Sequence, residues 1–391
     1  MLFTDHGLSP AQISILFVIW STTAFVLEVP SGAWADTYSR RKLLVLGALL
    51  SGLGYAAWIT VPSFAGFALG FVLWALSGAL TSGTFEALAY DELTAAGAGD
   101  AYVRVIGHGT TLSLLGMTVA TLAAFPLVAL GGIGLTLWVS VGVCAVQLAV
   151  VRSLPPAPPQ RSPDADDESG PDAAGTRVWS AYVRALRTGV SEAVRHGGVR
   201  TAVLAGAGLM GLLAFDEYFG LLLDERGASV AAVPLWLVLV AVAQAGGGAL
   251  ASRAVAWPAG AFTALVALSG ATLAGGALID HPAGIAAIAA GYGALQLTIV
   301  VADVRLQDRI ESGARATVTS VTNVLAELLA VAVYVAVGVG APHTGYGVML
   351  AAIAVLLALS ARRCGAALGR PRDAAAVRHG GRSGAADTVV S

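Results

Sequence analysis

The chain has 391 residues, of which 57% are hydrophobic and only 12% are charged. Soluble proteins carry about 25% charged residues, so about half of the expected charge is missing. Together with a mean hydropathy of +0.77, this indicates a membrane protein. The net charge of -2 gives no reason to expect a nucleic-acid partner. The two cysteines, Cys144 and Cys364, lie in unrelated contexts and predict neither a disulfide framework nor a thiolate metal site.

Eleven stretches are long and apolar enough to cross a membrane, since a spanning helix needs about 20 mostly apolar residues. These runs lack the alternation of barrel strands, so they predict an all-α, polytopic membrane protein. In chain order, the predicted spans are 12–34, 43–61, 65–90, 105–127, 131–151, 201–223, 230–251, 256–279, 283–303, 316–338 and 345–361.

The basic residues predict the orientation. Alternate connections between the spans hold 21 of the 22 Lys and Arg residues, and the other set holds only Arg226. Basic residues stay on the cytoplasmic side, so we expect the N-terminus outside and the C-terminus in the cytoplasm. A single Lys with abundant Ala, Gly and Val is typical of a GC-rich bacterial genome, so the predicted location is the bacterial plasma membrane.

A polar segment divides the spans into two groups. Residues 1–152 carry five spans and residues 201–361 carry six, and each group is expected to form a helical bundle. The connecting segment 153–200 begins as a Pro- and Asp-rich linker. Trp179, Tyr182 and Leu186 then recur at helical spacing, which predicts an amphipathic helix on the cytoplasmic leaflet. The tail 362–391 is predicted to be disordered.

The two groups resemble each other. Residues 32–36 match 248–252, Glu86 and Asp91 match Asp303 and Asp308, and residues 5–9 match 225–229, with offsets of 216 to 220. These matches indicate a parallel duplication, which is a common transporter architecture. The last match predicts a helix ahead of residue 1, encoded in frame upstream. Either the chain starts too late, which we favour, or the protein works with eleven helices.

The loop after the first span carries a recognisable motif. Its sequence, Gly32-Ala33-Trp34-Ala35-Asp36-Thr37-Tyr38-Ser39-Arg40-Arg41-Lys42, resembles the signature G-x-L-A-D-R-x-G-R-K/R of the major facilitator superfamily. Gly32, Ala35, Asp36, Arg40 and Arg41 match, whereas Trp34, Thr37 and Ser39 depart from the pattern. The resemblance implies a monomeric secondary transporter of two six-helix bundles that works by alternating access, with the first five spans equivalent to family helices 2–6.

The same loop predicts a gating latch. Asp36 can pair with Arg40 or Arg41 across a tight turn, and Gly32 allows close helix approach. Glu86 and Asp91 are further partners at the same membrane face. Ion pairs that form in one state and break in another bias a rocking motion. In the alternative interpretation, the basic residues of this loop only set the topology.

Several predicted spans contain acidic residues, which are costly in a membrane and therefore candidates for function. Glu327 lies near the middle of the tenth span, and Ser320 and Asn323 share its helix face. We expect Glu327 to couple protons or bind a cation; the alternative is an interhelical hydrogen bond of a protonated Glu. Asp216 and Glu217, beside Tyr218, and Trp74 are further candidates for substrate or proton contact.

The predicted cargo follows from the charges within the spans. No Lys or Arg lies in any predicted span, so an anion is disfavoured and a small, neutral or cationic, fairly apolar molecule fits better. Proton-coupled efflux is the leading hypothesis, with proton-coupled uptake of a neutral nutrient or a transport-inactive sensor or scaffold as alternatives. The six His residues are dispersed, so no metal site, cofactor or enzyme is predicted. The expected partners are the cargo, protons and membrane lipid.

Overall fold

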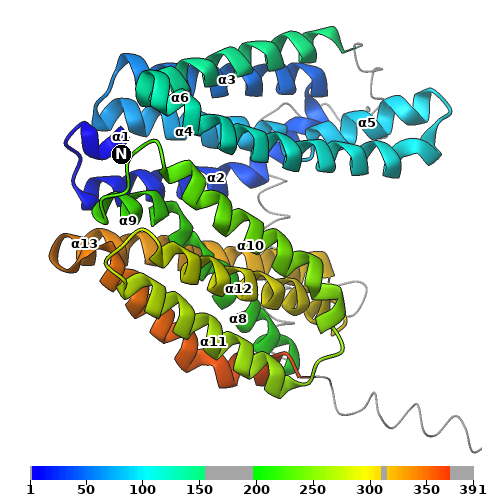
Figure 1. Ribbon diagram of the computed structural model, residues 1–391. Coiled ribbons are helices and arrows are strands. Elements are labelled where there is room, and N and C mark those ends of the chain that lie inside the picture. Colours follow the sequence, from blue (N-terminus) through cyan, green and yellow to red (C-terminus); the bar gives the residue numbers. More distant parts are fainter. Residues whose placement is uncertain (1, 155–196, 310–314, 370–391) are drawn as a thin grey trace, which may run out of the picture.

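The computed structural model describes residues 2–154, 197–309 and 315–369, and its helices form two groups (Figure 1). The predicted amphipathic helix lies outside the described residues, and so does the predicted tail from residue 370. Residues 362–367, predicted to be disordered, instead continue the last helix. No β-strand occurs in the described part of the chain, which confirms the all-α fold class. Helices dominate because lipid offers no hydrogen-bond partners to an unpaired backbone.

The first group contains α1 to α6. Its elements are α1 (Leu2–Asp5), α2 (Pro10–Thr37), α3 (Arg40–Thr60), α4 (Phe64–Thr81), α5 (Thr84–Ala95), η1 (Gly99–Ala101) and α6 (Tyr102–Ser153). Helix α2 begins with a capping box, in which the Ser9 hydroxyl accepts from Gln12 N and the Gln12 side chain accepts from Ser9 N. One predicted span, 65–90, is divided between α4 and α5 at Gly83, whose φ of 69° favours glycine.

The second group contains α8 to α13. Its elements are α8 (Gly197–Leu212), η2 (Leu213–Tyr218), α9 (Phe219–Glu225), α10 (Val233–Ala254), α11 (Ala259–Leu278), α12 (Gly284–Gln307) and α13 (Arg315–Ala367). The backbones of α10 and α12 approach closely where a methyl group at Gly247 would collide with Gly293 O. Membrane helices commonly pack through small residues in this way.

The described residues include nine helices long and apolar enough to cross a membrane. Two of these, α6 and α13, contain non-helical glycines: Gly131 and Gly132 in α6, and Gly345 in α13. Each break falls at the first residues of a predicted span, 131–151 or 345–361, but the count of eleven spans stays a prediction. The division into domains at residues 152 and 201 also stays a prediction.

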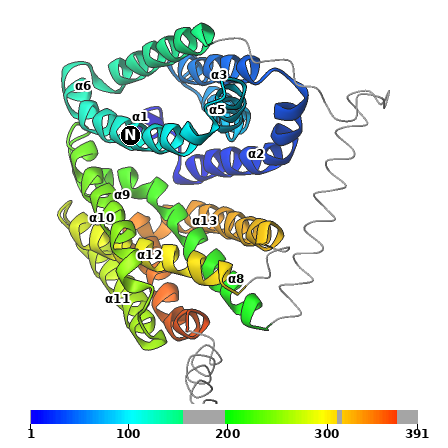
Figure 2. The same cartoon turned by 90° about the vertical axis from the view of Figure 1, so that its right-hand side faces the viewer.

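The two groups, called here the N bundle (α1 to α6) and the C bundle (α8 to α13), lie against each other along two helix pairs. Helix α2 packs against α13, and α6 packs against α10. Figure 2 shows the N bundle above the C bundle, with α2 and α13 facing each other. A methyl group at Gly338 of α13 would lie 2.8 Å from Ser14 Cβ of α2, so the two helices are in close contact there. This junction positions the candidate site.

Candidate functional site at the junction of the two bundles

A buried hydrogen bond and a cluster of rings join the bundles. The Ser14 hydroxyl of α2 lies 2.8 Å from the Tyr218 hydroxyl of the C bundle, and both side chains are buried. The Phe17 ring stands edge-on to Tyr218 with centroids 5.3 Å apart, and it lies 5.6 Å from the Tyr334 ring of α13. Tyr218, predicted as a site residue, is therefore part of the contact between the bundles.

Glu327 also reaches across the junction. Its carboxylate accepts a hydrogen bond from the Ser21 hydroxyl of α2, while Ser21 itself is buried and Glu327 half-buried. A carboxylate held by the opposite bundle loses this partner when the bundles separate. Of the residues predicted to share its face, Ser320 is half-buried and Asn323 is exposed.

Asp216 and Glu217 lie where the helix between α8 and α9 tightens. Residues Leu213–Tyr218 form the 3₁₀ segment η2, and both acidic side chains are exposed on it. The Tyr292 hydroxyl donates to Leu213 O at 2.9 Å and so supports the start of this segment. A stretch of 3₁₀ helix within a membrane span often marks a functional hinge.

Trp74 lies elsewhere, in an aromatic cluster of the N bundle. Its ring is 5.3 Å from Tyr55 and 5.7 Å from Trp58, centroid to centroid. Trp58 continues to Phe71, and Phe71 to Phe17, so a chain of ring contacts leads from Trp74 to the junction. The structure therefore connects Trp74 to the site through packing and places it apart from Glu327.

The predicted latch residues lie at the other end of α2. Arg40 forms an ion pair with Asp91 of α5 and donates to Ala87 O at 2.8 Å. Arg41 donates to Arg152 O at the end of α6. Glu86 is exposed. Gly32 and Asp36 are in α2, but the surroundings of both lie outside the described part, so the predicted pairing of Asp36 stays a prediction.

Arginines also anchor the C bundle. The buried Arg305 of α12 donates to Val255 O at 3.1 Å and Trp257 O at 2.7 Å, and its guanidinium lies 4.6 Å from the Phe262 ring centroid. Arg309 donates to Ala367 O and Gly369 O at the end of α13, and burial lowers the pKa of its guanidinium.

The far end of the C bundle has its own ionic contacts. The Glu225 carboxylate accepts from Tyr346 N at 3.0 Å, and Arg226 donates to Ala277 O. Burial lowers the pKa of the Arg226 guanidinium, and the carboxylates of Glu225 and Asp280 act in the opposite direction. These contacts tie the end of α9 to the break in α13 at Gly345 and to the end of α11.

Sequence reasoning missed the contribution of α2. Ser14 and Ser21 are seven residues apart, so they lie on one face of a helix, two turns from each other. This polar stripe was a readable signal, equivalent to the one that identified Glu327. No group of three or more His, Cys, Asp or Glu side chains suited to a metal occurs among the described residues.

The paired bundles and their junction agree with the comparison to protein families. Residues 1–335 match the model of the Major Facilitator Superfamily. The chain belongs to this superfamily. It is therefore a multi-pass membrane transporter of small molecules and not an enzyme.

Solved structures support the same fold. The chain is similar to the crystal structure of a mutant form of the nucleoside transporter NupG, with 13% identity, 93% of each chain covered and a TM-score of 0.67. It is also similar to the crystal structure of NupG, with 15% identity, 95% of this chain and 93% of the other covered, and a TM-score of 0.63. No match was found among curated proteins.

Proposed function

We propose that this protein is a proton-coupled secondary transporter that exports a small, neutral or cationic, fairly apolar molecule by alternating access. One observation carries the proposal: the Glu327 carboxylate of the C bundle accepts a hydrogen bond from Ser21 of the N bundle. An ionisable group within a membrane span is costly, and it is retained where it serves transport.

The position of Glu327 suggests how a proton couples to the movement. While the bundles are together, Ser21 occupies one carboxylate oxygen. When they rock apart, the carboxyl gains access to water and exchanges its proton there, so its protonation state follows the conformation. Substrate binding that favours one arrangement would then move protons in a fixed ratio to cargo.

The surroundings of the junction suit an uncharged or cationic cargo. Phe17, Tyr218 and Tyr334 are buried against one another here and would offer aromatic surface when the bundles part, and Asp216, Glu217 and Glu327 offer negative charge. We assign Ser320, Asn323 and Trp74 to the same cargo path. Trp74 does not lie at the junction itself and is connected to it by the ring contacts of the aromatic cluster. Arg40 and Asp91 form the gate at the opposite end, together with Gly32, Asp36, Arg41 and Glu86.

A second candidate is proton-coupled uptake of a neutral nutrient. It is favoured by the similarity to two structures named as a nucleoside transporter, since a nucleoside is an uncharged molecule with a flat ring. At 13% and 15% identity this likeness shows the fold, and the cargo of NupG is not transferred to this chain. Two assays distinguish the candidates. Uptake predicts that vesicles import uridine, and export predicts that they expel ethidium.

The test is the substitution Glu327→Gln, which keeps a hydrogen-bond acceptor for Ser21 but cannot cycle a proton. In proteoliposomes with an imposed pH gradient, we expect gradient-driven accumulation of ethidium or uridine to fall more than tenfold, with normal membrane insertion. The matched control is Asp303→Asn, which removes an exposed carboxylate at the end of α12 and should leave accumulation within about twofold of the parent.

The result that would overturn the proposal is equally direct. If Glu327→Gln still concentrates cargo with the parent's dependence on the pH gradient, Glu327 has a structural role only. If the parent protein moves neither cargo nor protons with any compound of either class, the protein acts as a membrane sensor or scaffold.

A further inference from the structure

One buried side chain beside the junction of the bundles has a polar atom without a partner. Tyr346 of α13 is buried, with 8% of its surface exposed, and its hydroxyl has no hydrogen-bond partner within the described part of the chain. A buried hydroxyl without a partner destabilises the arrangement that contains it. Tyr346 therefore weakens this arrangement of the protein relative to any arrangement that gives its hydroxyl a partner.

The backbone of Tyr346, in contrast, is held in place. Gly345, with a φ of 82°, breaks α13, and Tyr346 is the first residue after the break. Its N–H donates to the Glu225 carboxylate at 3.0 Å, which satisfies an amide at the start of a helical segment. The missing partner thus concerns the hydroxyl alone, and rotation of the side chain is enough to change it.

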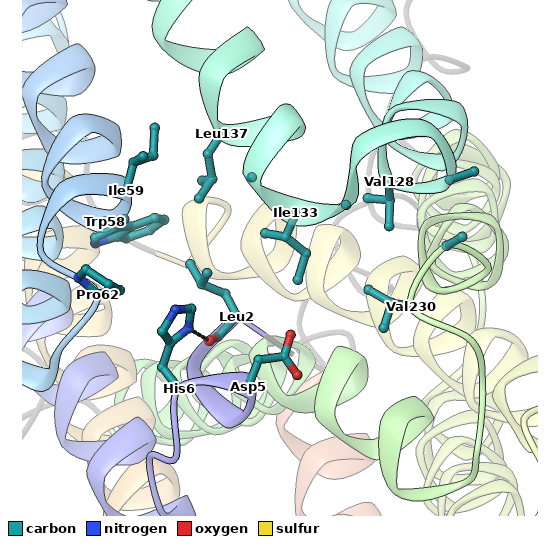
Figure 3. Close-up of a pocket in the computed structure, with 14 residues that line it drawn as sticks. Leu2, Asp5, His6, Trp58, Ile59, Pro62, Val128, Ile133, Leu137 and Val230 are labelled. Carbon is teal, nitrogen blue, oxygen red and sulfur yellow. Dashed lines mark hydrogen bonds between the residues drawn. The ribbon is translucent and has the colours of Figure 1, made fainter.

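The cavity beside α1 does not supply this partner. It has a volume of about 660 Å³, and its walls include Asp5, Trp58 and Val230 (Figure 3). Neither Tyr346 nor Tyr218 lines it. Because the Tyr346 oxygen itself is buried, a helix added at the wall of this cavity would not reach it either.

The neighbouring Tyr218 hydroxyl is the partner that a movement of the bundles would release. The Tyr218 ring lies 5.8 Å from the Tyr346 ring, centroid to centroid, and the two ring planes differ by 33°. In this arrangement the Tyr218 hydroxyl is bonded to Ser14 of the N bundle, 2.8 Å away. When α2 moves away from the C bundle, Ser14 leaves with it. Tyr218 and Tyr346 stay behind in the same bundle, and their hydroxyls can meet after rotation of the side chains.

We propose that Tyr346 is a positioning residue for the opening of the junction, because its hydroxyl replaces Ser14 as the partner of Tyr218. One hydrogen bond across the closed junction is exchanged for one within the C bundle, so opening does not leave Tyr218 unpaired. The unpaired hydroxyl of Tyr346 gains a bond at the same time. Both effects lower the free-energy cost of separating the bundles. The proposal rests on the alternating access of the proposed function, but not on its cargo or its proton coupling.

The test measures how often the junction opens. The half-buried Ala11 of α2 lies against α13, since a methyl group at Gly338 would be 3.6 Å from the Ala11 Cα. Ala11→Cys is introduced into the full chain, with the two buried cysteines, Cys144 and Cys364, replaced by alanine, and the protein is placed in lipid nanodiscs. When opening and closing are faster than labelling, the rate of labelling by fluorescein maleimide follows the open fraction.

We expect Tyr346→Phe to slow this labelling about fivefold, because it removes an unpaired hydroxyl from the closed junction and a bonded one from the open junction. A purely structural role predicts the opposite sign, since a lost contact would loosen the junction and speed the labelling. The matched control is Tyr90→Phe, the same change at an exposed position of α5, which should leave the rate within about twofold of the parent. A second reporter, His343→Cys at an exposed position of α13, should be labelled equally with and without Tyr346→Phe.

A double-mutant cycle identifies the partner of the hydroxyl in the open junction. In a Tyr218→Phe background, Tyr346 has no tyrosine hydroxyl to join in either arrangement. The further change Tyr346→Phe should then alter the labelling rate less than about twofold. If water satisfies the hydroxyl instead, Tyr346→Phe keeps its full effect in this background.

Two outcomes overturn the proposal. The first is labelling of the Tyr346→Phe variant that is as fast as that of the parent, or faster. The second is an undiminished effect of Tyr346→Phe in the Tyr218→Phe background, which would exclude the exchange of partners. Both are measured without cargo or a pH gradient, so they are independent of the transport assays on Glu327→Gln, and the two proposals fail separately.

Discussion

The two bundles contain the same type of turn, but they differ in how an arginine holds the connection between two of their helices. In the N bundle, Arg40 at the start of α3 pairs with the side chain of Asp91 on α5. In the C bundle, the cation is on α12, where the buried Arg305 holds the backbone carbonyls of Val255 and Trp257, just before α11. The equivalent connections are α2–α3 in the N bundle and α10–α11 in the C bundle. The first is held by an arginine of its own second helix, and the second by an arginine of another helix, α12.

This difference has a mechanical meaning. Two partly exposed side chains can separate and take up water at low cost, because both ions remain solvated. A buried guanidinium that leaves its carbonyl partners loses hydrogen bonds that water cannot readily replace. We therefore expect the Arg40–Asp91 pair to open and close during transport and the Arg305 clamp to stay closed.

The largest expected effect is on stability, in the C bundle. Arg305→Gln removes two hydrogen bonds from a charged donor and the contact with Phe262, so the free energy of unfolding should fall by about 3 kcal/mol. Unfolding in mixed detergent micelles measures it. The control Arg253→Gln, at an exposed position near the end of α10, should change it by less than about 0.5 kcal/mol.

The transport rate sharpens the same comparison. If the clamp is static, the folded fraction of Arg305→Gln should transport at close to the parent's rate. A rate loss larger than that of Asp91→Asn would show instead that the C bundle carries the moving latch.

A smaller effect is expected in the N bundle, where function should suffer more than stability. Asp91→Asn removes the ion pair with Arg40, so the free energy of unfolding should fall by only about 1 kcal/mol and the transport rate about tenfold. The repeat places the exposed Asp308 at the equivalent position of the C bundle. Asp308→Asn, measured in the same proteoliposomes, should have little effect on either quantity. Equal rate losses in the two variants would remove the distinction between the bundles.

The smallest effect tests what the bundles have in common. Gly7 and Gly227, with φ values of 77° and 75°, end α1 and α9. The turn bonds are alike: Gly7 N donates to Thr4 O and Gly227 N to Asp224 O, each at 2.9 Å. No neighbour within 4 Å would meet an added methyl at either position, so Gly→Ala strains only the backbone. Each variant should cost about 1 kcal/mol of the free energy of unfolding.

A third glycine controls this measurement. Gly208 is in the middle of α8 with no neighbour in the path of a methyl group. Gly208→Ala should therefore raise the free energy of unfolding by about 0.5–1 kcal/mol, as expected from helix propensity. Costs at Gly7 and Gly227 that differ by more than about 1 kcal/mol would argue against a common turn.

Much of the helical framework could be predicted because lipid restricts the backbone so strongly. An apolar run of about 20 residues in a membrane forms a helix, whatever its neighbours are. The predicted spans accordingly follow the observed helices to within a few residues, except where Gly83 divides α4 from α5, where η2 interrupts the span 201–223, and where α13 continues to Ala367. Which side chains pair with each other was harder to predict from the sequence. Asp91 was predicted only as a further partner of the basic loop, and the structure pairs it with Arg40.

The sequence by itself determined which residues are apolar, which are charged, and which share a helix face, because these depend on composition and on the helical period. It therefore singled out Glu327 and its polar stripe. Only the tertiary structure decided that Ser21, 306 residues away, is its partner, that Trp74 lies in the aromatic cluster, and that a cavity forms beside Asp5. The reason is that contacts between helices depend on their crossing and rotation, which the shape of many side chains sets together.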